Sequence, residues 1–514
     1  MSQLRRSAIA RSLLMRLANS KQCCPHHASG GDGPICVAKL NSGKGNAASG
    51  ATVIIIHGWY THLLRLPLSW NHFNEGFNSC FISFIQGSTD YAFEMICSTL
   101  RFGRGVTAEI GWDLQYLRAR NTLIVTDGRV ANTLAFKEVE KSMKNVGINY
   151  RIFDEVQVEP SDQSMKKAID FARRMKCDSF IAVGGGSSID TCKAAALYAS
   201  NPEADFLDFV VAPFGKNLLP TNPMLPLIAV PTTAGTGSET TGVAIFDMPE
   251  KKCKTALRHR CLKPLLAIID PLNVISMPRN VAIYSGFDVL CHALESFTAK
   301  PYFQRSPRPQ RPSLRPVYQG SNPISDIWAQ EALKIIAKYF RRSVNDPGDE
   351  EARTQMLMAS SFAGMGFGNA GVHLCHGLSY PISSQGKHYT DKDYEHSHPL
   401  IPHGLSVVTT AAADFVFTTA ANPERHAVAA RLLGADLTVS ASEETIAQKL
   451  TDKIRGFMRD FGVPNGLSAL GFSHSDIDTL SDAAMNSMSA VSIAPRQTDR
   501  AAIAEIYEKS MQIF

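Results

Sequence analysis

Short apolar runs alternate with amphipathic segments through the middle of the chain. Five runs have the length and flanking turn residues of buried strands, at 121–125, 149–153, 180–183, 227–230 and 266–270. Helical spacing follows several of them, up to residue 146, near 164–176 and at 191–198. Strands that alternate with helices indicate a parallel sheet. We therefore predict an α/β domain over residues 88–272.

Beyond Pro271 the strand pattern fades and helical periodicity takes over. We predict helices at 287–299, 325–342, 351–365, 404–420, 424–433, 444–461 and 498–512. A loop rich in Pro and Arg, residues 300–323, interrupts the series. The second domain is therefore expected to be all-helical and to span residues 273–514.

The basic excess of the chain is confined to its amino terminus. The formal net charge is +5, and residues 1–50 hold seven Lys or Arg against one acid, so the remainder is nearly neutral. This balance gives no support for nucleic-acid binding. Residues 1–18 are rich in Arg and Ser, contain no acid and are apolar between the arginines, as in mitochondrial transit peptides. We predict a transit peptide and linker over 1–45 and a location in the mitochondrial matrix; a disordered basic tail is the alternative.

Glycines follow one of the predicted strands and precede a helix. Gly184-Gly-Gly-Ser-Ser-Ile-Asp190 has the strand–turn–helix setting in which backbone N–H groups and a helix amino terminus bind a pyrophosphate. A second turn, Pro231 to Glu239, gathers hydroxyls and glycines after another strand. Asp127 ends an early strand, where a carboxylate can bind an adenosine ribose and favours NAD over NADP. The first domain is thus predicted to be Rossmann-like and to bind a dinucleotide, although tight structural turns remain the simpler interpretation.

Four residues of the second domain are candidate metal ligands. Asp288 and His292 are four apart and share a helical face, and His376 and His403 lie in Gly-flanked segments. One carboxylate and three imidazoles suit Fe2+ or Zn2+, and such an ion can polarise an alcohol or carbonyl oxygen. His373 competes with His376, because both could lie on one helical face.

Together these motifs resemble the iron-containing (group III) alcohol dehydrogenases. The shared stretches are Gly184–Asp190, Pro231–Glu239, Gly286–Ser296 and Pro402–Ser406, and the resemblance covers about residues 88–514. It implies a Rossmann-like domain followed by an all-helical one, the dehydroquinate synthase-like fold. It also implies Asp288, His292, His376 and His403 as metal ligands, which favours His376 over His373. The cofactor positions that it implies are Asp127, Gly185, Gly186, Ser187, Thr232, Thr233 and Lys254.

Tyr380 departs from the family pattern. Many members have a second His four residues beyond the ligand that corresponds to His376, and here that position is Tyr380. A Tyr with an ordinary pKa near 10 relays protons poorly at neutral pH. We include Tyr380 among the catalytic residues with the four ligands and leave the proton path open.

Further stretches resemble a mitochondrial branch of this family that transfers hydride between a hydroxyacid and an oxoacid. They are Thr89–Met95, Thr240–Asp247, Tyr318–Trp328 and Gly368–Ile382. The resemblance implies that 4-hydroxybutyrate is oxidised to succinate semialdehyde while 2-oxoglutarate is reduced to D-2-hydroxyglutarate, through a divalent metal and a tightly bound NAD(H). It implies small-molecule partners, neither nucleic acid nor membrane, and leaves a homo-oligomer open. Alternatives are an NAD-dependent alcohol dehydrogenase with exchangeable cofactor and a catalytically inactive binding protein.

Both expected substrates carry carboxylates, so the pocket needs a cation or several donors. The Pro/Arg-rich loop is one candidate source, through Arg305, Arg308, Arg311 and Arg315. A solvated basic loop is the alternative interpretation.

Residues 46–87 have no counterpart in the family pattern. Strand-like runs at 53–56 and 81–85 occur there, and no apolar run is long enough for a membrane span. We predict an atypical insertion that is disordered or loosely packed. Our hypothesis is that 46–86 is a translated retained intron, with a lineage-specific insertion as the alternative; transcript reads across the junction distinguish them.

Overall fold

The computed structural model describes residues 36–37, 53–57, 60–64, 89–386, 388–394 and 399–514. The chain forms two compact units, Met1–Phe84 and Ile85–Phe514. The first contains a three-stranded antiparallel sheet in the order β1–β2–β3, with bounds β1 Cys36–Val37, β2 Val53–His57 and β3 Tyr60–Leu64. The strand-like run at 53–56 falls in β2. The predicted transit peptide and the run at 81–85 lie outside the described residues.

The second unit is built on a six-stranded parallel sheet, as the alternating pattern predicts. The strand order is β4–β11–β8–β7–β5–β6. The strand bounds are β4 Thr99–Phe102, β5 Asn121–Val125, β6 Asn149–Phe153, β7 Ser179–Gly184, β8 Leu227–Pro231 and β11 Leu266–Ile269. β4 is an edge strand that the apolar pattern did not predict.

Helices cover both faces of this sheet, because successive strand side chains point to opposite faces. They are α3 Ile110–Tyr116, α4 Leu134–Val146, α5 Asp162–Met175 and α6 Gly186–Ser200. Ile124 packs in one core with residues of α3 and α4, whereas its neighbours Leu123 and Val125 pack in another with residues of α5 and α6. The result is the doubly wound architecture expected of a dinucleotide-binding domain.

A separate antiparallel hairpin was not predicted. β9 Val243–Met248 pairs with β10 Cys253–Arg258. β9 begins shortly after the second candidate turn, Pro231 to Glu239. β10 packs against α10, a helix of the second domain, so the hairpin links the two parts of the unit.

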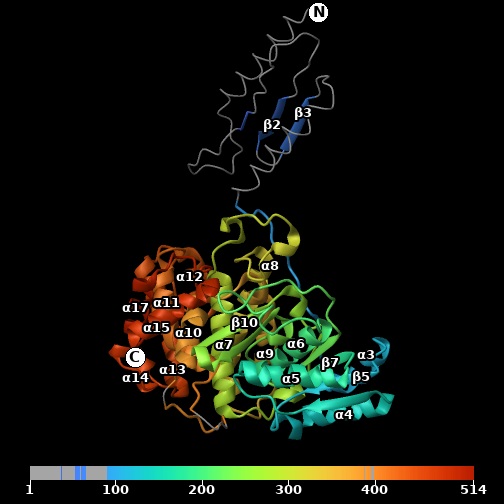
Figure 1. The fold of residues 1–514 in the computed structure, drawn as a ribbon. Helices are drawn as coiled ribbons and strands as arrows, with labels where there is room; N and C mark the ends of the chain where they lie inside the picture. Colours follow the sequence, from blue (N-terminus) through green and yellow to red (C-terminus); the bar gives the residue numbers. More distant parts are fainter. Residues whose placement is uncertain (1–35, 38–52, 58–59, 65–88, 387, 395–398) are drawn as a thin grey trace, which may run out of the picture. The chain divides into compact units, whose positions relative to one another are not determined.

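The remainder is all-helical, and Figure 1 shows α7 between the sheet-bearing region and the orange-to-red helices of the carboxyl-terminal part. The helices are α7 Arg279–Thr298, α8 Pro323–Asn345, α9 Glu350–Ala370, α10 Leu374–Ser384, α11 His403–Thr419, α12 Pro423–Leu432, α13 Glu443–Phe461, α14 Gly466–Ala469, α15 Ile477–Ala484, α16 Met488–Val491 and α17 Arg500–Lys509. Most match the predicted helices closely, but α7 begins eight residues earlier than expected, and α10 was not predicted as a helix from periodicity. No helix among the described residues is both long and apolar enough to cross a membrane.

Candidate metal and dinucleotide site

Three of the four predicted ligands lie together in the interior of the helical part. Asp288 and His292 are one turn apart on α7, and His376 lies in the first turn of α10. Nε2 of His376 is 3.3 Å from Oδ1 of Asp288, and Nε2 of His292 is 3.6 Å from the same oxygen. Donor atoms of the three residues all lie within 4.8 Å of one another. One cation bonded to each at about 2.0–2.2 Å fits this spacing.

The fourth predicted ligand, His403, approaches from the first residue of α11. Its Nε2 lies 3.6 Å from Oδ1 of Asp288. Gly404 permits this approach, because a Cβ there would collide with the carbonyl oxygen of Tyr284 on α7. The side chain of His403 is 24% exposed, whereas that of Asp288 is only 2% exposed. The His403 side is therefore the open side of the cluster.

The electrostatics favour the metal-binding forms of these groups. Burial alone would raise the pKa of Asp288, but His292, His403 and the hydrogen bond to His376 hold it well below its usual range. Burial lowers the pKa of His292 to about 3, so its ring stays neutral. Phe367 stacks on that ring with the centroids 3.8 Å apart, which fixes its plane. Metal ions bind carboxylates and neutral imidazoles, the forms that Asp288 and His292 have at neutral pH.

Glu295 on α7 positions His376, and sequence reasoning did not single it out. Its Oε2 is hydrogen-bonded to Nδ1 of His376, and its Oε1 accepts the backbone N–H of His373 at 2.9 Å. Burial lowers the pKa of His376, but Glu295 and Asp288 raise it more, to about 10. A cation would replace the proton on Nε2. Glu295 is three residues after His292, so helical spacing was the available signal.

Replacing Glu295 with Gln should weaken binding of a divalent metal by about 10- to 100-fold, the usual cost of losing a carboxylate that orients a ligand imidazole. Gln has a single acceptor oxygen, which cannot serve both the backbone N–H of His373 and the Nδ1–H of His376, so the tautomer of His376 is held less firmly. Metal titration of the purified variant measures the effect. Glu331→Gln, on α8 with a side chain 46% exposed, is the control, and equal affinity of E295Q and wild type would contradict this role.

His373, the competing candidate, turns away from the cluster. Its Nε2 is 3.0 Å from Oγ1 of Thr298 and its Nδ1 is 3.5 Å from Oε1 of Glu295, and it is not among the three clustered donors. Burial lowers its pKa to about 4. The geometry thus brings His376, rather than His373, to Asp288.

The predicted cofactor segments meet at the carboxyl edge of the sheet, because β5, β7 and β8 are adjacent parallel strands. The N–H of Thr232 donates to the carbonyl of Gly184 at 3.0 Å. A Cβ on Gly185 would lie 3.2 Å from Thr233, and a Cβ on Gly186 would lie 2.6 Å from Thr236. The glycines therefore let the two turns approach closely at the amino terminus of α6, the arrangement that binds a pyrophosphate.

Asp127 stands beside this turn. Its Oδ1 accepts the N–H groups of Arg129 and Val130, both at 2.9 Å. Its Oδ2 faces Gly184, since a Cβ on that glycine would lie 3.8 Å from it. One oxygen thus fixes the carboxylate while the other is directed toward the glycine turn, as a ribose ligand requires.

Lys254 on β10 lies in a buried ion-pair cluster that joins the two candidate sites. Its Nζ is 2.6 Å from Glu159 and 2.8 Å from Asp247. The N–H of Glu159 donates to Oγ of Ser187, in the first turn of α6. His403 helps lower the pKa of Glu159, although burial raises it and Lys254 is the main lowering charge. The cluster therefore lies between the glycine turn and the open side of the metal site.

The turn after β8 contacts the ligand helix directly. A Cβ on Gly235 would lie 2.5 Å from Cβ of Ser285, one turn before Asp288 on α7. A Cβ on Gly237, where φ is +58°, would lie 2.7 Å from Gly364 of α9. These close approaches bring the candidate dinucleotide turns to the helix that carries the candidate metal ligands.

Tyr380 lies one turn after His376 on α10. Burial raises its pKa above the ordinary tyrosine value, and the neighbouring Tyr318 adds to the rise. Its hydroxyl therefore keeps its proton at neutral pH and can donate a hydrogen bond, but it is a poor base.

The arginines of the Pro/Arg-rich loop contact an amino-terminal segment of the same unit. Arg305 and Arg315 both pair with the buried Asp90, at 2.5 and 3.2 Å, and Arg308 lies over the ring of Tyr91. Arg311 is exposed.

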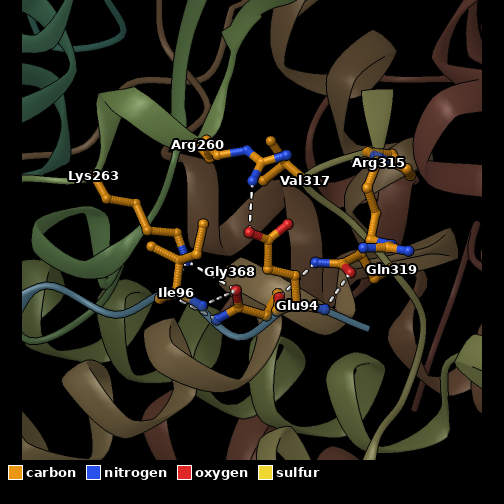
Figure 2. Close-up of a pocket in the computed structure, with 10 residues that line it drawn as sticks. Glu94, Ile96, Arg260, Lys263, Arg315, Val317, Gln319 and Gly368 are labelled. Atoms are coloured by element: carbon orange, nitrogen blue, oxygen red, sulfur yellow. Dashed lines mark hydrogen bonds and ion pairs between the residues drawn. The ribbon is translucent and has the colours of Figure 1, made fainter. Parts of the chain in front are cut away.

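Beside this contact, Figure 2 shows Arg260 bonded to Glu94, around a cavity of about 20 Å³. That volume holds roughly one water molecule. It is too small for a dicarboxylate substrate.

The sequence comparisons agree with this architecture. Residues 97–271 match the model for iron-containing alcohol dehydrogenase, and residues 317–511 match the carboxyl-terminal model of the same family. A Caenorhabditis briggsae protein named mitochondrial hydroxyacid-oxoacid transhydrogenase is 61% identical over 508 residues, covering 99% of this chain and 100% of the relative. A Bos taurus protein of the same name is 53% identical over 427 residues, 83% of this chain and 91% of the relative.

Solved structures extend the similarity to the fold. A 1,3-propanediol oxidoreductase superposes with a TM-score of 0.71 at 27% identity, covering 82% of this chain and 100% of its own. An alcohol dehydrogenase from Oenococcus oeni gives 0.70 at 26% identity, with the same coverage. From its two matched domains and its close relatives, the chain belongs to the iron-containing alcohol dehydrogenase family.

Proposed function

We propose that the protein is a hydroxyacid–oxoacid transhydrogenase. It would oxidise 4-hydroxybutyrate to succinate semialdehyde and reduce 2-oxoglutarate to D-2-hydroxyglutarate. The main support is the contact between the cofactor turn at Gly235 and the ligand helix at Ser285, together with the names of the close relatives. This contact lets one metal and one hydride carrier serve both substrates in turn.

The family uses a divalent metal and NAD(H), and the residues present suit both. Asp288, His292 and His376 would hold Fe2+ or Zn2+, with His403 on the open side. The cofactor would lie on Gly185, Gly186, Ser187, Thr232 and Thr233, with Asp127 at the ribose. When bound, the metal would polarise the substrate oxygen and NAD would carry the hydride.

The remaining residues would orient the substrates and exclude water rather than react with the substrates. Lys254, fixed by Glu159 and Asp247, supplies a positive charge between the cofactor turn and the metal cluster. Tyr380 keeps its proton and can donate a hydrogen bond to the substrate oxygen. Burial of the ligands shields them from water on every side except that of His403.

Purified protein should convert 4-hydroxybutyrate plus 2-oxoglutarate to products without added NAD, because the cofactor stays bound between half-reactions. With 4-hydroxybutyrate alone, reduction should stop at one equivalent of bound NADH. Absorbance at the NADH band and product analysis measure both. Steady release of NADH into solution from added NAD would instead establish the alternative, an alcohol dehydrogenase with exchangeable cofactor.

The proposed location is the mitochondrion. The close relatives are named as mitochondrial proteins, and the basic, acid-free residues 1–18 have the composition of a transit peptide.

A further inference from the structure

The proposed substrates share one structural element, and this inference rests on that proposed function. In 4-hydroxybutyrate and in 2-oxoglutarate alike, two methylene groups separate the reacting carbon from a carboxylate. A single cation at a fixed distance from the metal could therefore bind both substrates. A carboxylate in a partly buried site requires such a partner.

Arg258 has no carboxylate partner among the described residues. It is the last residue of β10, opposite Val243 of β9, and it is partly buried. Its guanidinium lies over the ring of Tyr318, 4.7 Å from the centroid. Its buried Nε has no hydrogen-bond partner among the described residues, and the guanidinium forms no ion pair with any of them.

Other arginines of this unit either have a carboxylate partner or are closed off from solvent. Arg260 pairs with Glu94 at 2.6 Å, and Arg305 and Arg315 pair with Asp90. Arg353 also has buried donors without a partner, but it is only 1% exposed and donates to the carbonyls of residues 274 and 277, so a substrate does not reach it. Arg258 therefore retains the donor capacity that a substrate carboxylate would use.

Two structural links place Arg258 near the metal cluster. β10 packs against α10, the helix that carries His376 and Tyr380. Tyr318 belongs to the same core cluster as Phe367, whose ring stacks on that of His292.

The charges agree with this placement. Arg258 lowers the pKa of Tyr380 while Glu295 and Asp288 raise it, although burial is the dominant cause of its raised value. Electrostatic effects fall with distance, so Arg258 and the ligand helix both lie near Tyr380.

We propose that Arg258 binds the carboxylate that both substrates carry two methylenes from the reacting carbon, with the Tyr318 ring supporting the guanidinium plane. A guanidinium presents two parallel N–H donors that match a carboxylate, and stacking on an aromatic ring orders it before binding. The second carboxylate of 2-oxoglutarate adjoins the reacting carbon and so belongs at the metal end of the pocket. One arginine would thus select for chain length in both half-reactions.

Steady-state kinetics of Arg258→Gln in the full-length holoprotein test this assignment. The KM for 4-hydroxybutyrate and for 2-oxoglutarate should each rise about 10- to 100-fold, the usual loss for hydrogen bonds to a charged group. Arg258→Lys keeps the positive charge but loses the two parallel N–H donors of the guanidinium. Its KM values should lie between those of wild type and R258Q. Calorimetric binding of 2-oxoglutarate should weaken by the same factor as its KM, with metal content unchanged.

Arg496→Gln is the matched control, because Arg496 also lies over an aromatic ring, that of Phe417, but is exposed at the surface. It should keep wild-type KM values and metal content. If R258Q keeps the wild-type KM values and the wild-type affinity for 2-oxoglutarate, the role proposed for Arg258 is wrong, whereas the proposed function is unaffected. If the wild-type protein neither binds nor reduces 2-oxoglutarate, the proposed function fails instead.

Discussion

Replacing Asp288 with Asn should remove the bound metal and lower transhydrogenase turnover by at least about 1000-fold, since Lewis-acid polarisation contributes several kcal/mol to such reactions. Asp288 is the only carboxylate within the three-residue cluster of the described chain. The imidazoles of His292, His376 and His403 all lie within 3.6 Å of its Oδ1. Asn keeps the shape but loses the negative charge that these groups surround.

The metal content and the activity of purified D288N, measured on the same sample, test this prediction. Asp452→Asn, an exposed position on α13, should behave as wild type in both assays. Full metal occupancy with full activity in D288N would refute the assignment of Asp288 as a ligand.

Lys254→Met should lower the free energy of unfolding by about 3–5 kcal/mol at neutral pH, because it leaves two buried carboxylates without their counter-charge. Burial would lower the pKa of Lys254, but Asp247 and Glu159 raise it well above its usual value. This contribution is fully present below the ordinary lysine pKa near 10.4 and is lost only as pH rises through the higher folded value. At neutral pH the substitution therefore removes the whole contribution of Lys254 to the free energy of unfolding.

The pH dependence of the stability lost in K254M identifies the cause of that loss. Without Lys254, the pKa of Glu159 would lose its main lowering charge and the pKa of Asp247, which burial already raises, would rise further, so the penalty should be larger at pH 8 than at pH 5. Urea unfolding at both pH values measures it. The triple variant K254M/E159Q/D247N should recover most of the stability; a deficit equal to that of K254M at both pH values would contradict the ion-pair account.

Much of the fold could be predicted because its strands and helices have strong periodicity. The runs at 121–125 and 180–183 are buried on both sheet faces and read as uninterrupted apolar segments. α10 escaped prediction because Gly377 and Pro381 interrupt its pattern and its stability comes from packing rather than propensity. The hairpin β9–β10 was missed since Asp247 and Lys254 interrupt the apolar runs of its two strands, which pair only with each other.

The structure brings the predicted ligands together, but the sequence analysis did not single out the residues that support them. Asp288 and His292 were proposed from helical spacing, whereas the choice of His376 over His373 needed the family resemblance or the three-dimensional geometry. Helical spacing after His292 was a local signal for Glu295, but the contacts of Glu295 and Arg258 join segments distant in sequence. No local pattern records such contacts.

Some expectations remain predictions. The boundary at residues 272 and 273 falls inside the single compact unit Ile85–Phe514. The retained-intron hypothesis for 46–86, the homo-oligomer and the identity of the metal likewise await experiment.

Isotope transfer tests the central claim, hydride carried between two substrates by a cofactor that stays bound. Protein is incubated with 4-hydroxybutyrate deuterated at C4, 2-oxoglutarate and an excess of unlabelled NADH. Mass spectrometry should find deuterium at C2 of D-2-hydroxyglutarate without dilution, and none in the free NADH. Unlabelled D-2-hydroxyglutarate, with deuterium in the free nicotinamide pool, would contradict the account.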